Sequence, residues 1–365
     1  MTDIIFNREN INWQTGESPL FLGERLGLYD SINTSHPKLF ELYKHQKSID
    51  WSEDEINLEN SRLDMLQAPP DLVDLMIDNL SYQWEIDSVA SRSFAVLLAP
   101  FITNSEFWAA TLKNQEIEVT HALTYSEINR QCIADPNRIF KAMAENEFIK
   151  ERSVLPYKYL NNLAIAGAQY QLGLIKNDQN LFDTVFMAYI VMYLIERLQF
   201  MSSFSSSFIT AENGIFRGIC LLIQKIAIDE LDVHSAVGNY VIRSLLKNDP
   251  RAISTLERKE KEIRNILKEF LHAEYAFNKK IFKNRKVLGL NADLNNSWAE
   301  YNLWFAEDTL GFTTQPKPKS PLMYMDNWLN IDKTQNANQE SDNNNYKKIF
   351  VQETLSDNEV LDIVF

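Results

Sequence analysis

The segment EIEVTHALTY, residues 116–125, carries side chains that can bind a metal ion or be oxidised. At about 100° per residue, Glu118, His121 and Tyr125 share one face of a helix. Glu116 points nearly opposite. Taken alone, this stretch favours a surface Glu–His pair above a half-buried tyrosine, so a metal site needs a second observation.

A similar pair occurs later, in the segment DELDVH. Its Glu230 and His234 lie one helical turn apart, and residues at this spacing share a helix face. An acidic residue within an apolar segment also precedes each pair. Asp87 precedes Glu118 in this way, and Glu196 precedes Glu230 at a similar distance. The repeated order is much more specific than either pair alone.

Four carboxylates on neighbouring helices would place a large negative charge inside the protein. A buried carboxylate is costly unless it is paired, hydrogen-bonded or bound to a metal ion. Ferritin-like di-iron and di-manganese bundles use this set of ligands, with one acid from each of two helices and a Glu–His pair from each of two others. Carboxylate and imidazole ligands suit iron or manganese. The sequence therefore predicts a two-metal site with these ligands: Asp87, Glu118, His121, Glu196, Glu230 and His234.

Long helices are the elements that would position these residues. Among 365 residues there are only 10 glycines and 11 prolines, and apolar residues recur at helical spacing from about residue 25 to 330. We predict an all-α, ferritin-like helical bundle with the metal site in its core. Helix breaks are expected at Pro69-Pro70, Pro100, Asp135-Pro136, Pro156, Asn248-Asp249-Pro250 and the proline-rich segment 315–321.

Composition excludes several classes of protein. A net charge of −14 argues against binding nucleic acid or anionic lipid through bulk charge. The first residues lack the features of a signal peptide. The longest uncharged apolar run, 185–195, is too short to cross a bilayer. With only Cys132 and Cys220 there is no disulfide framework. A cytoplasmic protein without a membrane or nucleic-acid partner is expected.

The chain divides into three parts by composition. An N-terminal segment, 1–24, precedes the helical domain, 25–330, and a polar, Asn-rich tail covers 331–365. The tail has the composition of a disordered segment. Its last residues, LDIVF, form a short apolar sequence on a polar tether, which favours a peptide that docks into another protein. A frayed end without function is the alternative.

These motifs together resemble the small (β) subunit of class I ribonucleotide reductase over nearly the whole chain. The metal-ligand motifs of that family correspond here to IDSV, EVTHALTY, IERLQFMSSF and DELDVH. The resemblance implies that Tyr125 carries a radical. It also implies that Phe200, Phe204 and Ile226 form the apolar pocket around that radical.

The resemblance extends beyond the metal ligands. SIDWSEDEINL matches the family's tryptophan motif and implies that Trp51 takes part in radical transfer, together with His121 and Asp229. WLNIDKTQNANQESDNNNY resembles the start of the family's C-terminal tail, and implies that Glu340 and Tyr346 carry the radical onward.

The resemblance also implies a function and partners. A di-iron centre, with manganese as an alternative, activates O2 and oxidises Tyr125. The radical then moves to a large (α) catalytic subunit that reduces ribonucleotides, with diphosphates favoured as substrates. Such chemistry needs three cysteines, whereas this chain has two, so the substrate site is expected in the large subunit. A homodimer that docks through its tails is implied as well.

Two departures from the family pattern concern the second Glu–His pair. The family usually has Glu-x-x-His, whereas three residues separate Glu230 from His234. A π-bulge would absorb the extra residue. The family commonly has arginine before the aspartate of this motif, where this chain has Ile228. The spare carboxylate of Asp232 is expected to face away from Glu230.

Two other functions fit parts of the sequence. A ferritin-like di-metal oxidase or iron-storage protein would need the same ligands, but it would not need Trp51, Tyr125 and Tyr346 together. A metal-free helical interaction module would leave the acids and histidines solvated, and it would bind no stoichiometric iron or manganese.

Overall fold

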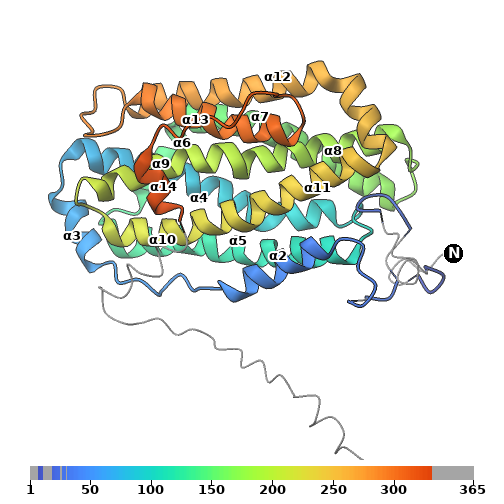
Figure 1. Ribbon diagram of the computed structural model, residues 1–365. Helices are drawn as coiled ribbons and strands as arrows, with labels where there is room; N and C mark the ends of the chain where they lie inside the picture. Colours follow the sequence, from blue (N-terminus) through green and yellow to red (C-terminus); the bar gives the residue numbers. More distant parts are fainter. Residues whose placement is uncertain (1–6, 11–18, 25–26, 30, 331–365) are drawn as a thin grey trace, which may run out of the picture.

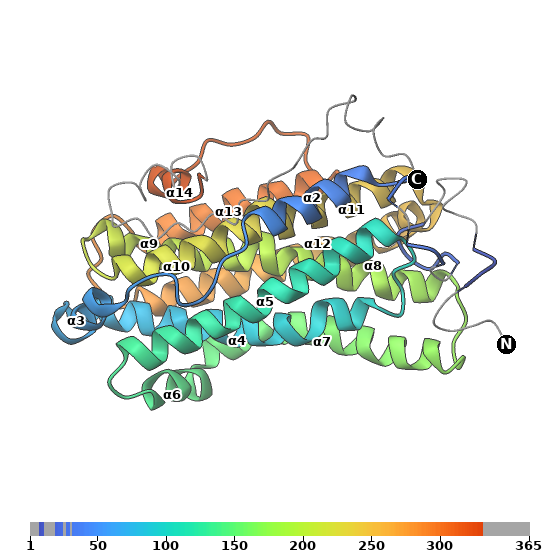
Figure 2. The same ribbon diagram turned by 90° about the horizontal axis from the view of Figure 1, so that it is seen from below.

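The computed structural model describes residues 7–10, 19–24, 27–29 and 31–330, and these form an elongated bundle of long helices (Figures 1 and 2). Within these ranges the only β-structure is an isolated bridge between Phe21 and Ile102. The predicted all-α architecture is therefore confirmed. The helices are α2 (Pro37–Ser48), α3 (Glu59–Gln67), α4 (Pro70–Leu98), α5 (Ser105–Cys132), α6 (Asn137–Glu145), α7 (Glu147–Gln171), α8 (Gln179–Leu194), α9 (Met201–Glu212), α10 (Arg217–Ile228), α11 (Ser235–Asn248), α12 (Pro250–Ile281), α13 (Ala292–Thr309) and α14 (Met323–Trp328).

Two π-helices interrupt the core helices. The segment η1 (Ile195–Phe200) joins α8 to α9, and η2 (Asp229–His234) joins α10 to α11. Every residue from 185 to 210 is buried, which explains why the first part of this stretch, 185–195, is apolar on all sides. The two continuous segments α8–η1–α9 and α10–η2–α11 lie in the bundle with α4 and α5 (Figure 2).

Most of the predicted helix breaks are confirmed. Pro70 is the first residue of α4, and Pro250 is the first residue of α12, where a missing N–H has no cost. Asp249 caps α12 by accepting a hydrogen bond from the Arg251 N–H at 2.9 Å. Local sequence signals therefore set these boundaries.

The break predicted at Pro156 is wrong, because this proline lies inside α7. A proline inside a helix removes the hydrogen bond to the carbonyl four residues earlier. That carbonyl belongs to Arg152, and it accepts a hydrogen bond from Gln199 Nε2 at 3.1 Å. A neighbouring segment thus replaces the lost hydrogen bond, and the helix continues through the proline.

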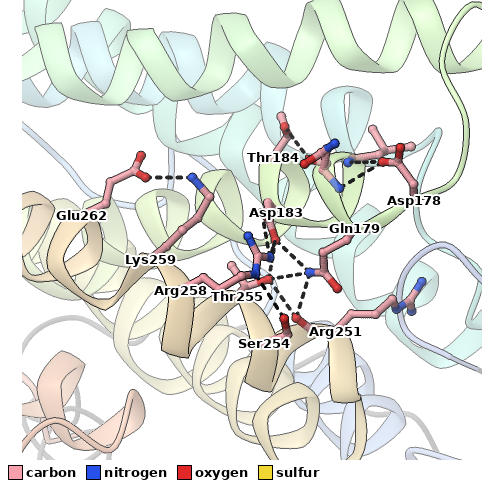
Figure 3. A network of polar contacts seen from close by, with 12 residues as sticks. Asp178, Gln179, Asp183, Thr184, Arg251, Ser254, Thr255, Arg258, Lys259 and Glu262 are labelled. Atoms are coloured by element: carbon pink, nitrogen blue, oxygen red, sulfur yellow. Dashed lines mark hydrogen bonds and ion pairs between the residues drawn. The ribbon is translucent and has the colours of Figure 1, made fainter.

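A polar network joins the first turns of α8 to α12 (Figure 3). Asp183, 5% exposed, accepts hydrogen bonds from Arg258 at 2.7 and 2.9 Å. Its Oδ1 also accepts from Gln179 at 2.8 Å and from the Thr255 hydroxyl at 2.6 Å. We refer to these four residues as the Asp183 network. They fix the beginning of the helical segment that leads into η1.

No helix among the described residues is long and apolar enough to cross a membrane. The predicted tail, 331–365, lies outside the described residues, as does most of the predicted N-terminal segment, 1–24. The three-part division of the chain stays a prediction.

Candidate metal centre

Six of the residues predicted to bind metal come together in two overlapping groups inside the bundle. One group is Asp87, Glu118, His121 and Glu230, and the other is Glu118, Glu196, Glu230 and His234. Within each group the ligand atoms lie within 4.8 Å of one another. Because Glu118 and Glu230 belong to both groups, their carboxylates are placed to bridge two neighbouring metal positions.

Each histidine turns one nitrogen towards the shared carboxylates. His121 Nδ1 lies 3.1 Å from Glu230 Oε1 and 3.4 Å from Glu118 Oε2. His234 Nδ1 lies 2.8 Å from Glu230 Oε2 and 3.1 Å from Glu118 Oε1. His121 presents its other nitrogen to Asp229, and this kind of outer partner orients a metal-binding imidazole.

The residues of the cluster fit a pair of divalent metal ions. All six are buried, with exposed fractions of 6% or less. Apart from the contacts of these six residues with one another and with Tyr125, the oxygen atoms of the four carboxylates have no hydrogen-bond partner among the described residues. Buried polar atoms are normally satisfied. Four carboxylates with two imidazoles supply the charge and the donor atoms that two divalent ions require, and this donor set suits iron or manganese.

The pKa values of the cluster reflect its crowded charge. Burial, followed by the charge of Glu118, raises the pKa of Asp87 well above its usual value. Burial and the charge of Glu230 do the same to the pKa of Glu196. Burial lowers the pKa of His234, but Glu230 and Glu118 outweigh that effect and raise it to about 10. Without metal the cluster therefore holds protons, which metal ions would displace.

Two of the ligand-bearing segments are π-helices. Glu196 lies in η1, and both Glu230 and His234 lie in η2. A π-helix has more residues per turn than an α-helix, so it keeps Glu230 and His234 on one face despite the extra residue between them. This is the local structure that the π-bulge hypothesis required.

Tyr125 lies at the edge of the cluster, one helical turn beyond His121 on α5. Its side chain is 1% exposed. Burial and then the Asp87 carboxylate raise the pKa of Tyr125 well above its usual value, so the phenol keeps its proton. The proposed pocket residues Phe200, Phe204 and Ile226 are fully buried in the same apolar core, and the two phenylalanine rings stack with centroids 5.6 Å apart.

A hydrogen-bonded path leads from His121 to Trp51. Asp229 Oδ2 lies 3.1 Å from His121 Nε2 and accepts a hydrogen bond from Trp51 Nε1 at 2.7 Å. The rings of Trp51 and His121 stack with centroids 5.9 Å apart. The structure thus brings together three residues that are far apart in the sequence. Glu340 and Tyr346 lie outside the described residues.

The sequence interpretation missed Gln46. This residue of α2 is fully buried, and its Nε2 donates a hydrogen bond to Asp229 Oδ1 at 2.8 Å. It therefore holds the carboxylate oxygen that His121 and Trp51 leave free. The surrounding letters, YKHQK, are polar and resemble an exposed helix face, so the available signal was only its place five residues before Trp51.

Comparison with protein families identifies a match over most of the chain. The family described as "Ribonucleotide reductase, small chain" matches residues 30–315. The chain belongs to this family. Its membership confirms the resemblance found in the sequence and the prediction that the chain is the small subunit of a ribonucleotide reductase.

Curated relatives match over nearly their full length. The ribonucleoside-diphosphate reductase subunit beta of Buchnera aphidicola subsp. Acyrthosiphon pisum is 27% identical, with 98% of each chain covered. The ribonucleoside-diphosphate reductase 1 subunit beta of Salmonella typhimurium is 24% identical, with 90% of this chain and 91% of the relative covered.

Solved structures share the fold of this small subunit. The ribonucleotide reductase R2 subunit from Clostridium botulinum superposes with a TM-score of 0.76 at 19% identity, covering 91% of this chain and 99% of that one. The dimanganese(II)-NrdF protein of Streptococcus sanguinis superposes with a TM-score of 0.65 at 16% identity, covering 84% and 100%. These likenesses and the buried carboxylate–histidine cluster confirm the predicted ferritin-like bundle.

Proposed function

We propose that this chain is the radical-generating β subunit of a ribonucleoside-diphosphate reductase, with Tyr125 as the radical carrier. The observation that carries the proposal is a buried ligand set for two metal ions beside a buried tyrosine. Two similar proteins are subunits of ribonucleoside-diphosphate reductases, which supports diphosphates as the substrates of the complete enzyme.

We assign six residues as ligands and two iron ions as the native metals. One metal position would use Asp87 and His121, the other Glu196 and His234, with Glu118 and Glu230 shared. The donor set also accepts manganese, and one structurally similar protein contains dimanganese(II). When bound, the metal pair supplies the O2 activation that oxidises a neighbouring side chain.

The side chains around Tyr125 would then protect the radical. With O2 at the metal pair as the oxidant, Tyr125 would give up one electron and release its phenolic proton, so that a neutral phenoxyl radical remains. A fully buried site excludes water and reductants, which is the role proposed for Phe200, Phe204 and Ile226. Their packing also stabilises the core, and the two roles are compatible.

His121, Asp229 and Trp51 form the proposed route from the metal centre towards the protein surface. Asp229 accepts a hydrogen bond from Trp51 and lies beside His121, so it is placed to take a proton when the electron moves. By resemblance to the family, Glu340 and Tyr346 continue the route into a large catalytic subunit. That subunit, docked through residues 331–365, would hold the substrate and the redox cysteines.

We also propose a homodimer. Three apolar residues on one stripe of α5 are exposed: Leu112 at 44%, and Val119 and Leu123 at 46% each. Val96 on the neighbouring α4 is 63% exposed. An apolar surface of this kind is typical of an interface between subunits. Leu123→Glu is expected to shift the sedimentation coefficient from that of a dimer towards that of a monomer.

The cytoplasmic location stays a prediction.

The test of radical generation is an electron paramagnetic resonance spectrum of metal-free protein after addition of Fe(II) and O2. Wild-type protein should give a tyrosyl signal, and Tyr125→Phe should give none while binding the same amount of iron. Paired iron without a radical in the wild type would favour the alternative, a ferritin-like di-metal oxidase.

The test of radical transfer uses Trp51→Phe together with the large subunit. This variant should bind metal and form the Tyr125 radical as the wild type does, because Trp51 contacts Asp229 but is not a member of either ligand group. Nucleotide reduction should be lost. Retained turnover would contradict the route through Trp51.

A further inference from the structure

We propose that a reciprocal contact between Gln199 of η1 and Arg152 of α7 positions Glu196 and so sets the affinity of one of the two metal positions. This inference rests on the proposed two-metal centre. Gln199 belongs to neither ligand group, and it would act through Glu196, three residues earlier in the same π-helix. It is therefore a positioning residue.

The contact joins both main chains. Gln199 Nε2 donates a hydrogen bond to the backbone carbonyl of Arg152 at 3.1 Å. In return, Arg152 Nη2 donates to the backbone carbonyl of Gln199 at 3.1 Å. Gln199 is 1% exposed, as is Arg152, so water does not compete freely for these hydrogen bonds. Each residue thus fixes the backbone of the other.

Pro156 makes this contact available. In an unbroken α-helix the carbonyl of Arg152 would accept a hydrogen bond from the N–H of residue 156. Proline has no N–H, so this carbonyl lacks its usual partner in α7 and receives the Gln199 amide. The proline that failed to break α7 therefore creates the acceptor that η1 uses.

The Arg152 side chain is itself held in place. It forms a bidentate ion pair with the buried Glu274 of α12, at 2.8 and 2.9 Å. Its guanidinium group lies over the ring of Tyr82, at 3.5 Å, and over that of Phe277, at 4.1 Å. Tyr82 also donates a hydrogen bond from its hydroxyl to Gln199 Oε1 at 3.1 Å. Three helices, α4, α7 and α12, thus fix Gln199.

Glu196 is the carboxylate on which this support acts, because it is the only one of the four that lies in η1. It belongs only to the group with His234, whereas Glu118 and Glu230 belong to both groups. Its carboxylate lies beside that of Glu230 and, by hydrogen-bond geometry, accepts from no donor among the described residues, so its position depends strongly on the backbone of η1. Loosening η1 should therefore weaken one metal position and spare the one that includes Asp87.

The experiment is a titration of metal-free, full-length protein with Mn(II), with free Mn(II) measured by electron paramagnetic resonance. Wild-type protein should bind two ions per chain. Gln199→Met keeps the length of the side chain but removes its hydrogen bonds. It should bind one ion with wild-type affinity and the second roughly 10-fold to 100-fold more weakly, the range typical of outer partners of metal ligands.

Two further variants distinguish an effect on the position of Glu196 from an effect on the stability of the fold. Pro156→Ala restores an N–H that competes for the Arg152 carbonyl, so it should weaken the binding of the second Mn(II). It should not lower the melting temperature, because alanine is more favourable than proline inside a helix. Thr255→Val removes a buried hydroxyl from the Asp183 network (Figure 3), which lies at the beginning of α8, whereas η1 follows the end of α8. It should lower the melting temperature and leave both Mn(II) affinities unchanged.

The outcomes distinguish this inference from the proposed function. Wild-type affinity for both ions in Gln199→Met would overturn the positioning role, and so would equal weakening of both ions. If Gln199→Met does not fold, the second Mn(II) affinity of Pro156→Ala decides in the same way. Fewer than two ions bound by the wild type would contradict the proposed metal centre itself.

Discussion

Two buried polar clusters lie along the segment α8–η1, and they differ in how their charge is balanced. The Asp183 network has one carboxylate, which receives hydrogen bonds from a cation and two neutral side chains. The candidate metal centre has four carboxylates and two imidazoles, with no lysine or arginine in either ligand group. In the Asp183 network the guanidinium group of Arg258 balances the carboxylate charge. In the candidate metal centre the negative charge exceeds the positive charge, and metal cations would balance it.

The same residue type therefore behaves in opposite ways. Burial alone would raise the pKa of Asp183. Hydrogen bonds from Arg258, Thr255 and Gln179 outweigh this effect, and they lower the pKa below its usual value. For Asp87, burial and the charge of Glu118 both act in the raising direction. A buried acid with its own donors stabilises the fold, whereas a buried acid among other acids indicates a binding site.

Glu118→Gln should have the largest effect on metal binding. Because Glu118 belongs to both groups, the variant should lose about 100-fold or more in Mn(II) affinity at both positions. The metal-free variant should unfold near the wild-type temperature, since Glu230 still pairs with both histidines. Glu116→Gln is the matched control, because that carboxylate is 69% exposed on the opposite face. If Glu118→Gln still binds two ions tightly, Glu118 is not a ligand shared by both metal positions.

Metal affinity should rise with pH. In the metal-free cluster the pKa of His234 is raised to about 10 and that of Asp87 is also raised, so both hold protons that a metal ion must displace. Mn(II) affinity should therefore increase between about pH 6 and about pH 8, by up to tenfold per pH unit for each proton released. Calorimetry in buffers of different ionisation enthalpy counts these protons. An affinity independent of pH would mean that the cluster is already deprotonated.

Asp183→Asn should reduce the stability of the fold and leave metal binding unchanged, which is the reverse of the result expected for Glu118→Gln, and the change in free energy should be smaller. It should lower the free energy of unfolding by about 1–3 kcal/mol through loss of charged hydrogen bonds, and leave Mn(II) binding unchanged. Because the folded-state pKa of Asp183 is lowered, its stabilising effect is present above the usual aspartate pKa and is lost as pH falls through the lowered value. Denaturant unfolding at neutral and acid pH measures this. An equal loss of stability at every pH would exclude the charge as its source.

The sequence predicted the helices and the grouping of the ligands because both leave local, repeated patterns. The spacing of Glu118 and His121 encodes one helix face, and the uniformly apolar run before Glu196 encodes burial. Contacts between distant segments leave no such pattern. Gln46 resembled a surface residue because its partner, Asp229, lies on another helix.

Pro156 shows the same limit in another form. Read locally, it predicted a helix break, and the local rule is physically sound. The prediction failed because Gln199, 43 positions later, supplies the hydrogen bond that the carbonyl of Arg152 would otherwise lack. A tertiary contact decided the outcome, and one sequence contains no local signal for it.

The most direct test is anomalous X-ray diffraction from crystals of the full-length protein loaded with Mn(II). Two anomalous peaks should lie within the candidate metal centre, one beside Asp87 and His121 and one beside Glu196 and His234, with Glu118 and Glu230 between them. The Asp183 network should show none. Crystals with manganese bound elsewhere and no peak among these six residues would contradict the two-metal centre on which the proposed function depends.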